Sequence, residues 1–189
     1  MTDIMLDIET LGLKPGSIVV SVGACVFDRH TGEIGEKLYA PISVNSCEKA
    51  GLIMEPQTVI WWMGQEKEAR DAWMIGARSL RQIAQEFYEW FRIAEEGEEI
   101  PLDGSRAGRA AIWAQGDMDF NVWGAAMESV AVAQPWAFWA QRDTRTVYDI
   151  CGFDAKSVDR DGTYHNALDD ARHQVKCLHA AMKSKGLAQ

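Results

Sequence analysis

The first forty residues have the pattern of a β-sheet. In residues 4–8, isoleucine or leucine occupies every second position, which is the period of a strand with one apolar face. Residues 18–27 form a longer apolar run, rich in valine, that predicts a second strand. The polar segment 28–32 predicts a turn, after which residues 33–42 return as a third strand. The chain is therefore predicted to open with a three-stranded antiparallel meander.

A helical period begins near residue 80. Ser79 and Gln82 have the spacing of a capping box, in which two side chains bind backbone N–H groups at the start of a helix. From Leu80 to Ala94 apolar side chains recur every three or four positions, which predicts a helix with one buried face. Residues 95–110 are rich in charge and glycine and predict an exposed loop.

The remaining segments predict a strand and two more helices. We expect a short strand at 111–115, a helix at 117–132, a loop at 152–164 and a terminal helix at 166–183. Strands followed by helices, a strand and further helices indicate an α/β fold, with a mixed sheet covered by helices. A length of 189 residues fits one globular domain of ordinary size, so we expect a single domain over residues 1–189.

The charge balance limits how this protein could bind nucleic acid. Its 189 residues carry 19 basic and 28 acidic side chains, for a net charge of -9. Proteins that hold nucleic acid by charge alone usually present a basic face. An acidic protein can still approach phosphate through bound metal ions, which need carboxylate ligands.

Cysteine usage and hydropathy indicate a cytoplasmic protein. Its four cysteines are scattered and form neither a zinc motif nor a disulfide framework. We also find no basic segment followed by an apolar stretch at the N-terminus, and no apolar run of membrane-spanning length.

Two carboxylates interrupt the first predicted strand. Asp7 and Glu9 are two positions apart, so they project from one face while Leu6 and Ile8 project from the other. The pair could lie on a solvated strand face. Alternatively it could bind Mg²⁺ or Mn²⁺, which would relieve the repulsion between the two negative charges.

The terminal helix contributes a third acid. At about 100° per residue, Asp170 lies on the border of the apolar stripe and is directed toward the sheet, whereas Asp169 lies well outside the stripe. His165 precedes this helix and could be a surface or capping residue. It could also act as a general base, because imidazole titrates near neutral pH.

Two further acids follow the predicted strand at 111–115. Asp117 is placed to cap the next helix, with its side chain accepting from backbone N–H groups. Asp119, in the first helical turn, is then available for chemistry at the carboxyl end of a strand, where sheet proteins commonly build their sites.

In this order, Asp7-x-Glu9, Asp119 and His165-x-x-x-x-Asp170 resemble the motifs of the DEDDh branch of the DnaQ-like 3′–5′ exonucleases. Residues 58–70 and 138–146 further resemble a phage-type branch, the DexA-like exonucleases. That family usually places an aromatic residue directly before its middle aspartate. Here the order is Asp117-Met118-Asp119-Phe120, which leaves Asp117 open as the alternative to Asp119.

The resemblance implies a ribonuclease H-like α/β fold, with a mixed five-stranded sheet flanked by helices. It implies two divalent cations, Mg²⁺ or Mn²⁺, held by Asp7, Glu9, Asp119 and Asp170, while His165 takes a proton from the attacking water. The expected substrates are 3′ ends of single-stranded DNA or RNA, and the products are nucleoside 5′-monophosphates. A homodimer is left open.

The resemblance also places the terminal nucleotide of the substrate against Thr10, Leu11 and Gly12, although a plain turn would explain this segment nearly as well. Trp61 and Trp62 could stack on bases. We expect them to pack in the core instead, which is the commoner position of tryptophan in a helical segment.

Three basic side chains need no catalytic role. Arg142 and Arg145 could contact phosphates or simply be solvated. His30 lies in a predicted turn and is expected at the surface.

Two other functions fit the same pattern. A ribonuclease H-type endonuclease would share the fold and the acidic site, but His165 at the family's histidine position argues against it. A binding module without turnover would usually lack one of the carboxylates, and none is missing here.

Overall fold

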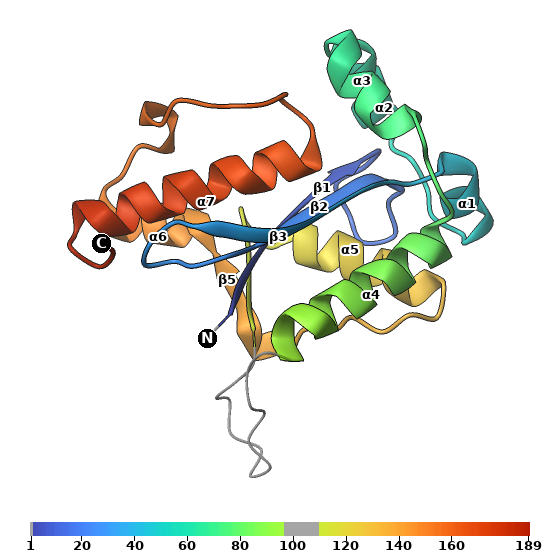
Figure 1. Cartoon of the computed structure of the whole chain (residues 1–189). Helices are drawn as coiled ribbons and strands as arrows, with labels where there is room; N and C mark the ends of the chain where they lie inside the picture. Colours follow the sequence, from blue (N-terminus) through green and yellow to red (C-terminus); the bar gives the residue numbers. More distant parts are fainter. Residues whose placement is uncertain (1, 97–109) are drawn as a thin grey trace.

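A mixed five-stranded sheet forms the centre of the molecule, in the order β3-β2-β1-β4-β5 (Figure 1). The computed structural model describes residues 2–96 and 110–189. Strands β1 to β3 are antiparallel, as expected for a meander, whereas β4 runs parallel to β1 and β5 runs parallel to β4. The strands are β1 (Asp3–Thr10), β2 (Val19–Phe27), β3 (Ile34–Pro41), β4 (Ala111–Ala114) and β5 (Gln141–Asp143).

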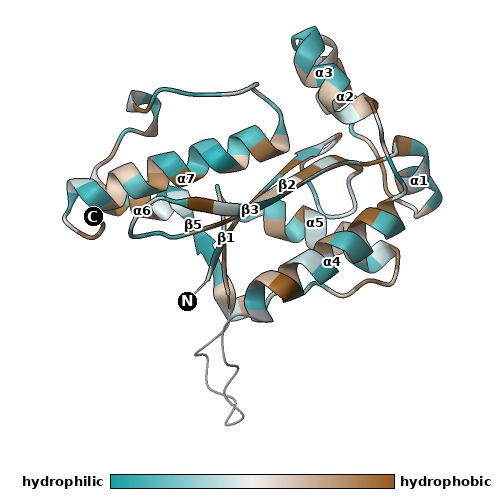
Figure 2. Cartoon of the chain, viewed as in Figure 1, coloured by the Kyte–Doolittle hydropathy of each residue, from teal (hydrophilic) through white to brown (hydrophobic). Residues whose placement is uncertain are grey.

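Helices cover both faces of this sheet, so the predicted fold class is confirmed. In the described residues they are α1 (Val44–Lys49), α2 (Pro56–Met63), α3 (Lys67–Met74), α4 (Leu80–Glu96), α5 (Met118–Ser129), α6 (Thr144–Cys151) and α7 (Ala167–Ser184). The ribbon of α4 changes repeatedly between hydrophobic and hydrophilic residues, as an amphipathic helix should (Figure 2). Within the described residues, no helix is both long and apolar enough to cross a membrane.

Strand β1 divides the core into two parts, because its side chains alternate between the faces. Ile4, Leu6 and Ile8 pack with α4 and α5 in one hydrophobic cluster. Met5 packs with α6 and α7 in the second cluster, on the face from which Asp7 also projects. The predicted alternation of this strand is confirmed.

Gly23 in β2 allows α7 to lie directly on the sheet. A Cβ atom at this position would lie 2.2 Å from the carbonyl carbon of Ala167 and 2.2 Å from the backbone nitrogen of Leu168. Gly23 is also the cross-strand partner of Asp7. The missing side chain therefore brings the first turn of α7, and with it Asp170, next to Asp7.

The sequence pattern located the long elements and the short strand β4, which confirms the strand predicted at 111–115, but it missed the other short elements. Helices α1, α2, α3 and α6 have six to eight residues and β5 has three, which is too short for a period to be recognised. Most of the predicted loop 95–110 lies outside the described residues, while Glu95 belongs to α4. The loop at 152–164 is confirmed, with one short 3₁₀ turn at Ala155–Ser157.

The close approach at Gly23 is testable by adding one methyl group. Gly23→Ala should lower the free energy of unfolding by about 1–3 kcal/mol, because the new Cβ would overlap backbone atoms that cannot rotate away. Urea denaturation measures this difference. Gly35→Ala in the neighbouring strand β3 is the matched control, since its Cβ would be 3.8 Å from the nearest atom. Equal stability of the two variants would contradict this account of the packing.

Candidate active site

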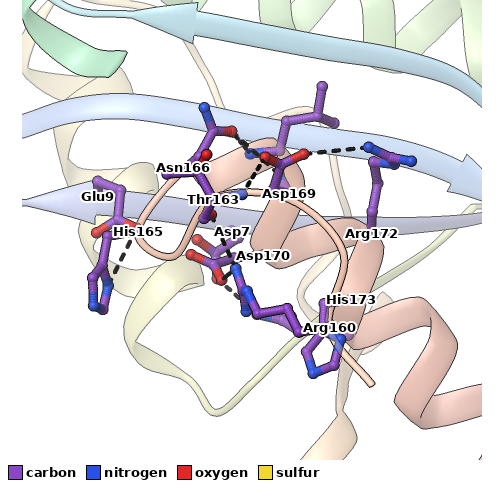
Figure 3. Close-up of polar contacts among 12 residues, drawn as sticks. Asp7, Glu9, Arg160, Thr163, His165, Asn166, Asp169, Asp170, Arg172 and His173 are labelled. Atoms are coloured by element: carbon purple, nitrogen blue, oxygen red, sulfur yellow. Dashed lines mark hydrogen bonds and ion pairs between the residues drawn. The ribbon is translucent and has the colours of Figure 1, made fainter. Parts of the chain in front are cut away.

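Four carboxylates from three elements line one cavity of about 410 Å³. Asp7 and Glu9 project from β1, Asp119 from the first turn of α5 and Asp170 from the first turn of α7. Figure 3 shows Asp7 and Asp170 close together, with Glu9 beside them. Residues 163 positions apart in the chain therefore contribute acids to the same space.

Local structure places two of these acids. Asn166 caps α7 by accepting from the backbone N–H groups of Leu168 and Asp169, so that Asp170 stands in the first turn. The backbone N–H of Ile8 donates to Oδ1 of Asp119 at 3.2 Å, which ties α5 to β1.

Asp119 and Asp117 have opposite environments. Asp119 is only 5% exposed and faces the cavity. Asp117 is exposed and accepts a bond from the side-chain amide of Asn121 at 3.3 Å. Asp117 does occupy the N-cap position of α5, but its side chain forms no capping hydrogen bond. The prediction of that bond is wrong. The backbone N–H of Gly116 donates instead to Asp143, at 2.9 Å.

Burial and mutual repulsion raise the pKa values of these acids. Burial raises the pKa of Asp7 well above its ordinary value, and the charge of Asp119 raises it further. Burial and the charge of Asp170 do the same to the pKa of Glu9. Burial raises the pKa of Asp119 to about 7, although its bond from Ile8 opposes this rise. Without a cation, the folded protein therefore favours the protonated forms.

His165 lies beside Glu9 on a platform of aromatic rings. Its Nδ1 atom is 4.0 Å from Oε1 of Glu9, and its backbone is left-handed, with a φ of 62°. The rings of Trp61 and Trp62 are roughly perpendicular to its ring, at centroid distances of 4.8 and 6.0 Å. Helix α2, which carries both tryptophans, thus supports the imidazole next to the carboxylates.

The two tryptophans differ in burial. Trp62 is buried, as expected, and its indole N–H donates to the carbonyl oxygen of Thr10 at 2.9 Å. The same expectation is wrong for Trp61, which is 46% exposed and lines a pocket of about 380 Å³ beside the carboxylates. The two residues occupy adjacent positions, so they face different sides of α2.

This second pocket borders the segment predicted to hold the terminal nucleotide. Thr10 lines the pocket together with Leu13, whose side chain is exposed. Leu11 is instead buried in the core, and Gly12 faces Ser17, whose hydroxyl would be 2.5 Å from an added Cβ. Of the predicted segment, the structure brings only Thr10 to the pocket wall.

Two residues of the site, Gln174 and Arg160, were not predicted from the sequence. Gln174 donates from Nε2 to Oδ1 of Asp7 at 2.7 Å, and its position one helical turn after Asp170 was a usable signal. Arg160 forms an ion pair with Asp170, as Figure 3 shows, and also bonds to the carbonyl oxygen of Thr163. Arg160 lies in a loop, where no sequence period could place it.

The other basic residues fall in different places. Arg145 lines the cavity with the carboxylates, whereas Arg142 donates to the backbone carbonyl groups of Trp139 and Gln141. His30 is exposed, as expected.

The donor set fits a hard divalent cation. Carboxylate oxygens are the ligands that Mg²⁺ and Mn²⁺ prefer. One ligand atom each from Glu9, His165 and Asp170 lie within 4.8 Å of one another. The buried Oε1 atom of Gln174 has no hydrogen-bond partner in the described structure, so the cavity contains a further unused oxygen. A cation would also relieve the repulsion that raises the pKa values of the acids.

The sheet order and its helical layers define an exonuclease fold of the ribonuclease H type. The nuclease domain of 3′hExo, described as a DEDDh family member bound to rAMP, has a similar structure, with a TM-score of 0.57 and 11% identity over 100% of this chain and 94% of that chain. A 3′-exonuclease structure that describes recognition of the histone mRNA stem-loop has a TM-score of 0.64 and 12% identity, over 98% and 83% of the two chains.

Residues 2–182 match the sequence model of the Rv2179c-like 3′–5′ exoribonuclease domain, and the chain belongs to this family. It is thus a 3′–5′ exonuclease of the DnaQ-like group. Exonuclease I of E. coli in complex with an oligonucleotide is also similar, with a TM-score of 0.67 and 12% identity, but this chain covers only 41% of it. Among curated proteins, no sequence match was found. The likeness to the phage-type branch stays a prediction.

The raised pKa values predict how stability changes with pH. A carboxyl group with a higher pKa in the folded than in the unfolded chain stabilises the fold at low pH, and that stability is lost as the pH rises. For Asp119, this stability is lost as the pH rises from 3.8, the ordinary pKa of the group, to about 7, its pKa in the folded protein. Asp7→Asn should therefore raise the metal-free melting temperature at about pH 7.5 by about 2–4 °C. This gain should shrink as the pH is lowered, because the wild-type acid then takes up a proton and loses its charge.

Thermal unfolding followed by circular dichroism measures this effect. Asp117→Asn is the matched control, because it removes an exposed acid from outside the cavity. Adding Mn²⁺ should raise the melting temperature of the wild type more than that of Asp7→Asn. A melting temperature of the wild type that does not respond to Mn²⁺ would contradict the metal site.

Proposed function

We propose that this protein removes nucleotides from the 3′ end of single-stranded nucleic acid, with RNA as its preferred substrate, and releases nucleoside 5′-monophosphates. The observation that supports this most directly is the convergence of Asp7, Glu9, Asp119 and Asp170 in one cavity with His165 at its edge. RNA is favoured because the chain belongs to an exoribonuclease family. Both similar structures described above as 3′-exonucleases concern RNA or its nucleotides.

The four carboxylates would hold two divalent cations, Mg²⁺ or Mn²⁺. When bound, such cations lower the pKa of water and stabilise the charge on the attacking and leaving oxygens. They also reverse the sign of the charge that an incoming phosphate meets. The carboxylate oxygens of Glu9 and Asp170 then act as ligands rather than as a repelling pair.

The protein's own side chains orient the reaction. His165 would accept a proton from the attacking water, since its ring lies at the cavity wall against Trp61 and Trp62. Gln174 fixes the carboxylate of Asp7, and Arg160 fixes that of Asp170. These partners limit the rotation of ligands that would otherwise be mobile in a polar cavity.

The pocket beside Trp61 would receive the terminal nucleoside. Thr10 and Leu13 form part of its wall, whereas Leu11 and Gly12 do not line it. Trp61 offers an exposed ring on which a base can stack. We include the whole chain, residues 1–189, in one exonuclease domain. A homodimer and a cytoplasmic location stay predictions from the sequence.

End-labelled strands test the proposed activity. With a label at the 5′ end, RNA should shorten stepwise from its 3′ end in Mn²⁺ or Mg²⁺, and a chelator should stop the reaction. Parallel digestion of DNA of the same sequence measures the sugar preference, which we expect to favour RNA. Cleavage of a circular strand would contradict the exonuclease and support the endonuclease.

Replacing His165 separates a general base from a metal ligand. His165→Ala should lower the rate of hydrolysis at least about a hundredfold, the usual contribution of a general base. Its affinity for Mn²⁺, measured by titration calorimetry, should change by less than about tenfold, which corresponds to about 1.4 kcal/mol. His30→Ala is the surface control. A large loss of Mn²⁺ affinity would instead make His165 a ligand with Glu9 and Asp170.

A further inference from the structure

Three cavities adjoin one another along the start of α5. The catalytic cavity shares Arg145 with a second cavity of about 350 Å³ at the carboxyl ends of β4 and β5. The second cavity shares Phe120 and Gln141 with a third, of about 850 Å³, that extends to Phe138. The second and third cavities, joined in this way, are called the α5 groove below.

The pocket beside Trp61 meets the catalytic cavity through other residues than the α5 groove does. That pocket shares Ile8, Glu9 and Met118 with the catalytic cavity and shares no lining residue with the groove. An exonuclease acting at a 3′ end needs room for one nucleoside on one side of the scissile bond and for the rest of the strand on the other. The smaller pocket meets the first need, and the α5 groove has the larger volume that the second requires.

Arg145 stands where the catalytic cavity and the groove meet. Its guanidinium lies over Gly116, because a Cβ atom there would be only 3.1 Å from Nη1. In the described part of the chain, this guanidinium forms no ion pair or hydrogen bond. A guanidinium without a bound acid, at the opening between two cavities, is suited to a phosphate oxygen.

The acids of the groove leave this position accessible to phosphate. Asp143 already accepts from the backbone N–H groups of Gly116, Arg145 and Thr146. Asp117 accepts from Asn121, and Glu128 lies along α5 in the third cavity. The third cavity also has an apolar wall, which includes Phe120, Val132 and Phe138 and could receive bases.

Phe138 forms the aromatic part of that wall. Its side chain is 74% exposed and is supported by the ring of Trp139, with a centroid distance of 4.9 Å. An exposed aromatic ring at the end of a groove is what sequence-tolerant binders of single strands use to stack bases.

We propose that the α5 groove binds the nucleotides on the 5′ side of the scissile bond, with Arg145 on a backbone phosphate and Phe138 stacked on a base. The inference rests on the proposed exonuclease function and adds the direction of the strand. The 3′ nucleoside enters beside Trp61, and the chain continues past Arg145 toward Phe138.

Substrate length tests this direction. For the wild type, kcat/KM should be higher for a strand of about 12 nucleotides than for a dinucleotide, because only the longer strand reaches Phe138. Phe138→Ala should lower the ratio of these two values about tenfold, in line with the loss of one stacked base. Ile150→Ala on α6 is the matched control, since Ile150 is 77% exposed and lines none of these cavities. It should leave the ratio unchanged.

Salt dependence tests Arg145 separately. Binding of the same strand is measured by fluorescence anisotropy in Mn²⁺ and in the His165→Ala background, where hydrolysis should be slow while the cations stay bound. Adding Arg145→Gln should reduce the slope of log affinity against log salt by about 0.7–1, as expected for the loss of one phosphate contact. The control Arg81→Gln, an exposed position on α4, should not change the slope.

Three outcomes overturn the inference. The first is equal kcat/KM for the dinucleotide and the longer strand, which leaves the exonuclease activity itself intact. The second is an unchanged ratio in Phe138→Ala together with a change in sedimentation, which would assign Phe138 to self-association. The third is an unchanged salt slope in Arg145→Gln. Absence of hydrolysis of any strand would instead overturn the proposed function.

Discussion

The structure depends on holding four like charges around one cavity. Buried carboxylates that face each other are unfavourable in their charged form, and the raised pKa of Asp119, about 7, reflects this. The fold offsets part of the repulsion by giving three of the acids a donor of their own. These donors are the Gln174 amide for Asp7, the Ile8 backbone N–H for Asp119 and the Arg160 guanidinium for Asp170. The remaining repulsion would be relieved by a bound cation, which is why we propose the cavity as a metal site.

Such a cluster can only be built from elements that meet rigidly. Strand β1 lies in the middle of the sheet and is bonded on both sides, so the positions of its side chains are fixed. Helix α7 reaches it because Gly23 has no side chain, and α5 reaches it through the bond to Ile8. The contacts that pack the core therefore also position the carboxylates. A change in packing at Gly23 would move Asp170.

The parts predicted from the sequence are those governed by a local period. Alternation placed Asp7 and Glu9 on one face of β1, and the helical angle directed Asp170 toward the sheet. The ion pair of Arg160 and the exposure of Trp61 were not predictable, because both depend on how a loop and a short helix pack against distant elements. The Leu11 side chain is buried for the same reason: the fold, rather than the motif, decides which side of the turn faces the pocket.

The charge of the chain links the proposed binding of nucleic acid to the proposed hydrolysis. The chain carries a net charge of -9, and the cavity contains four acids against two guanidinium groups. One of these groups, Arg160, is already paired with Asp170, so Arg145 alone cannot balance the acids toward a phosphate. Attraction of a nucleic acid to this cavity would therefore require the cations that we propose these acids to hold. On that proposal, a strand would be drawn into the cavity only when the ions that support hydrolysis are bound.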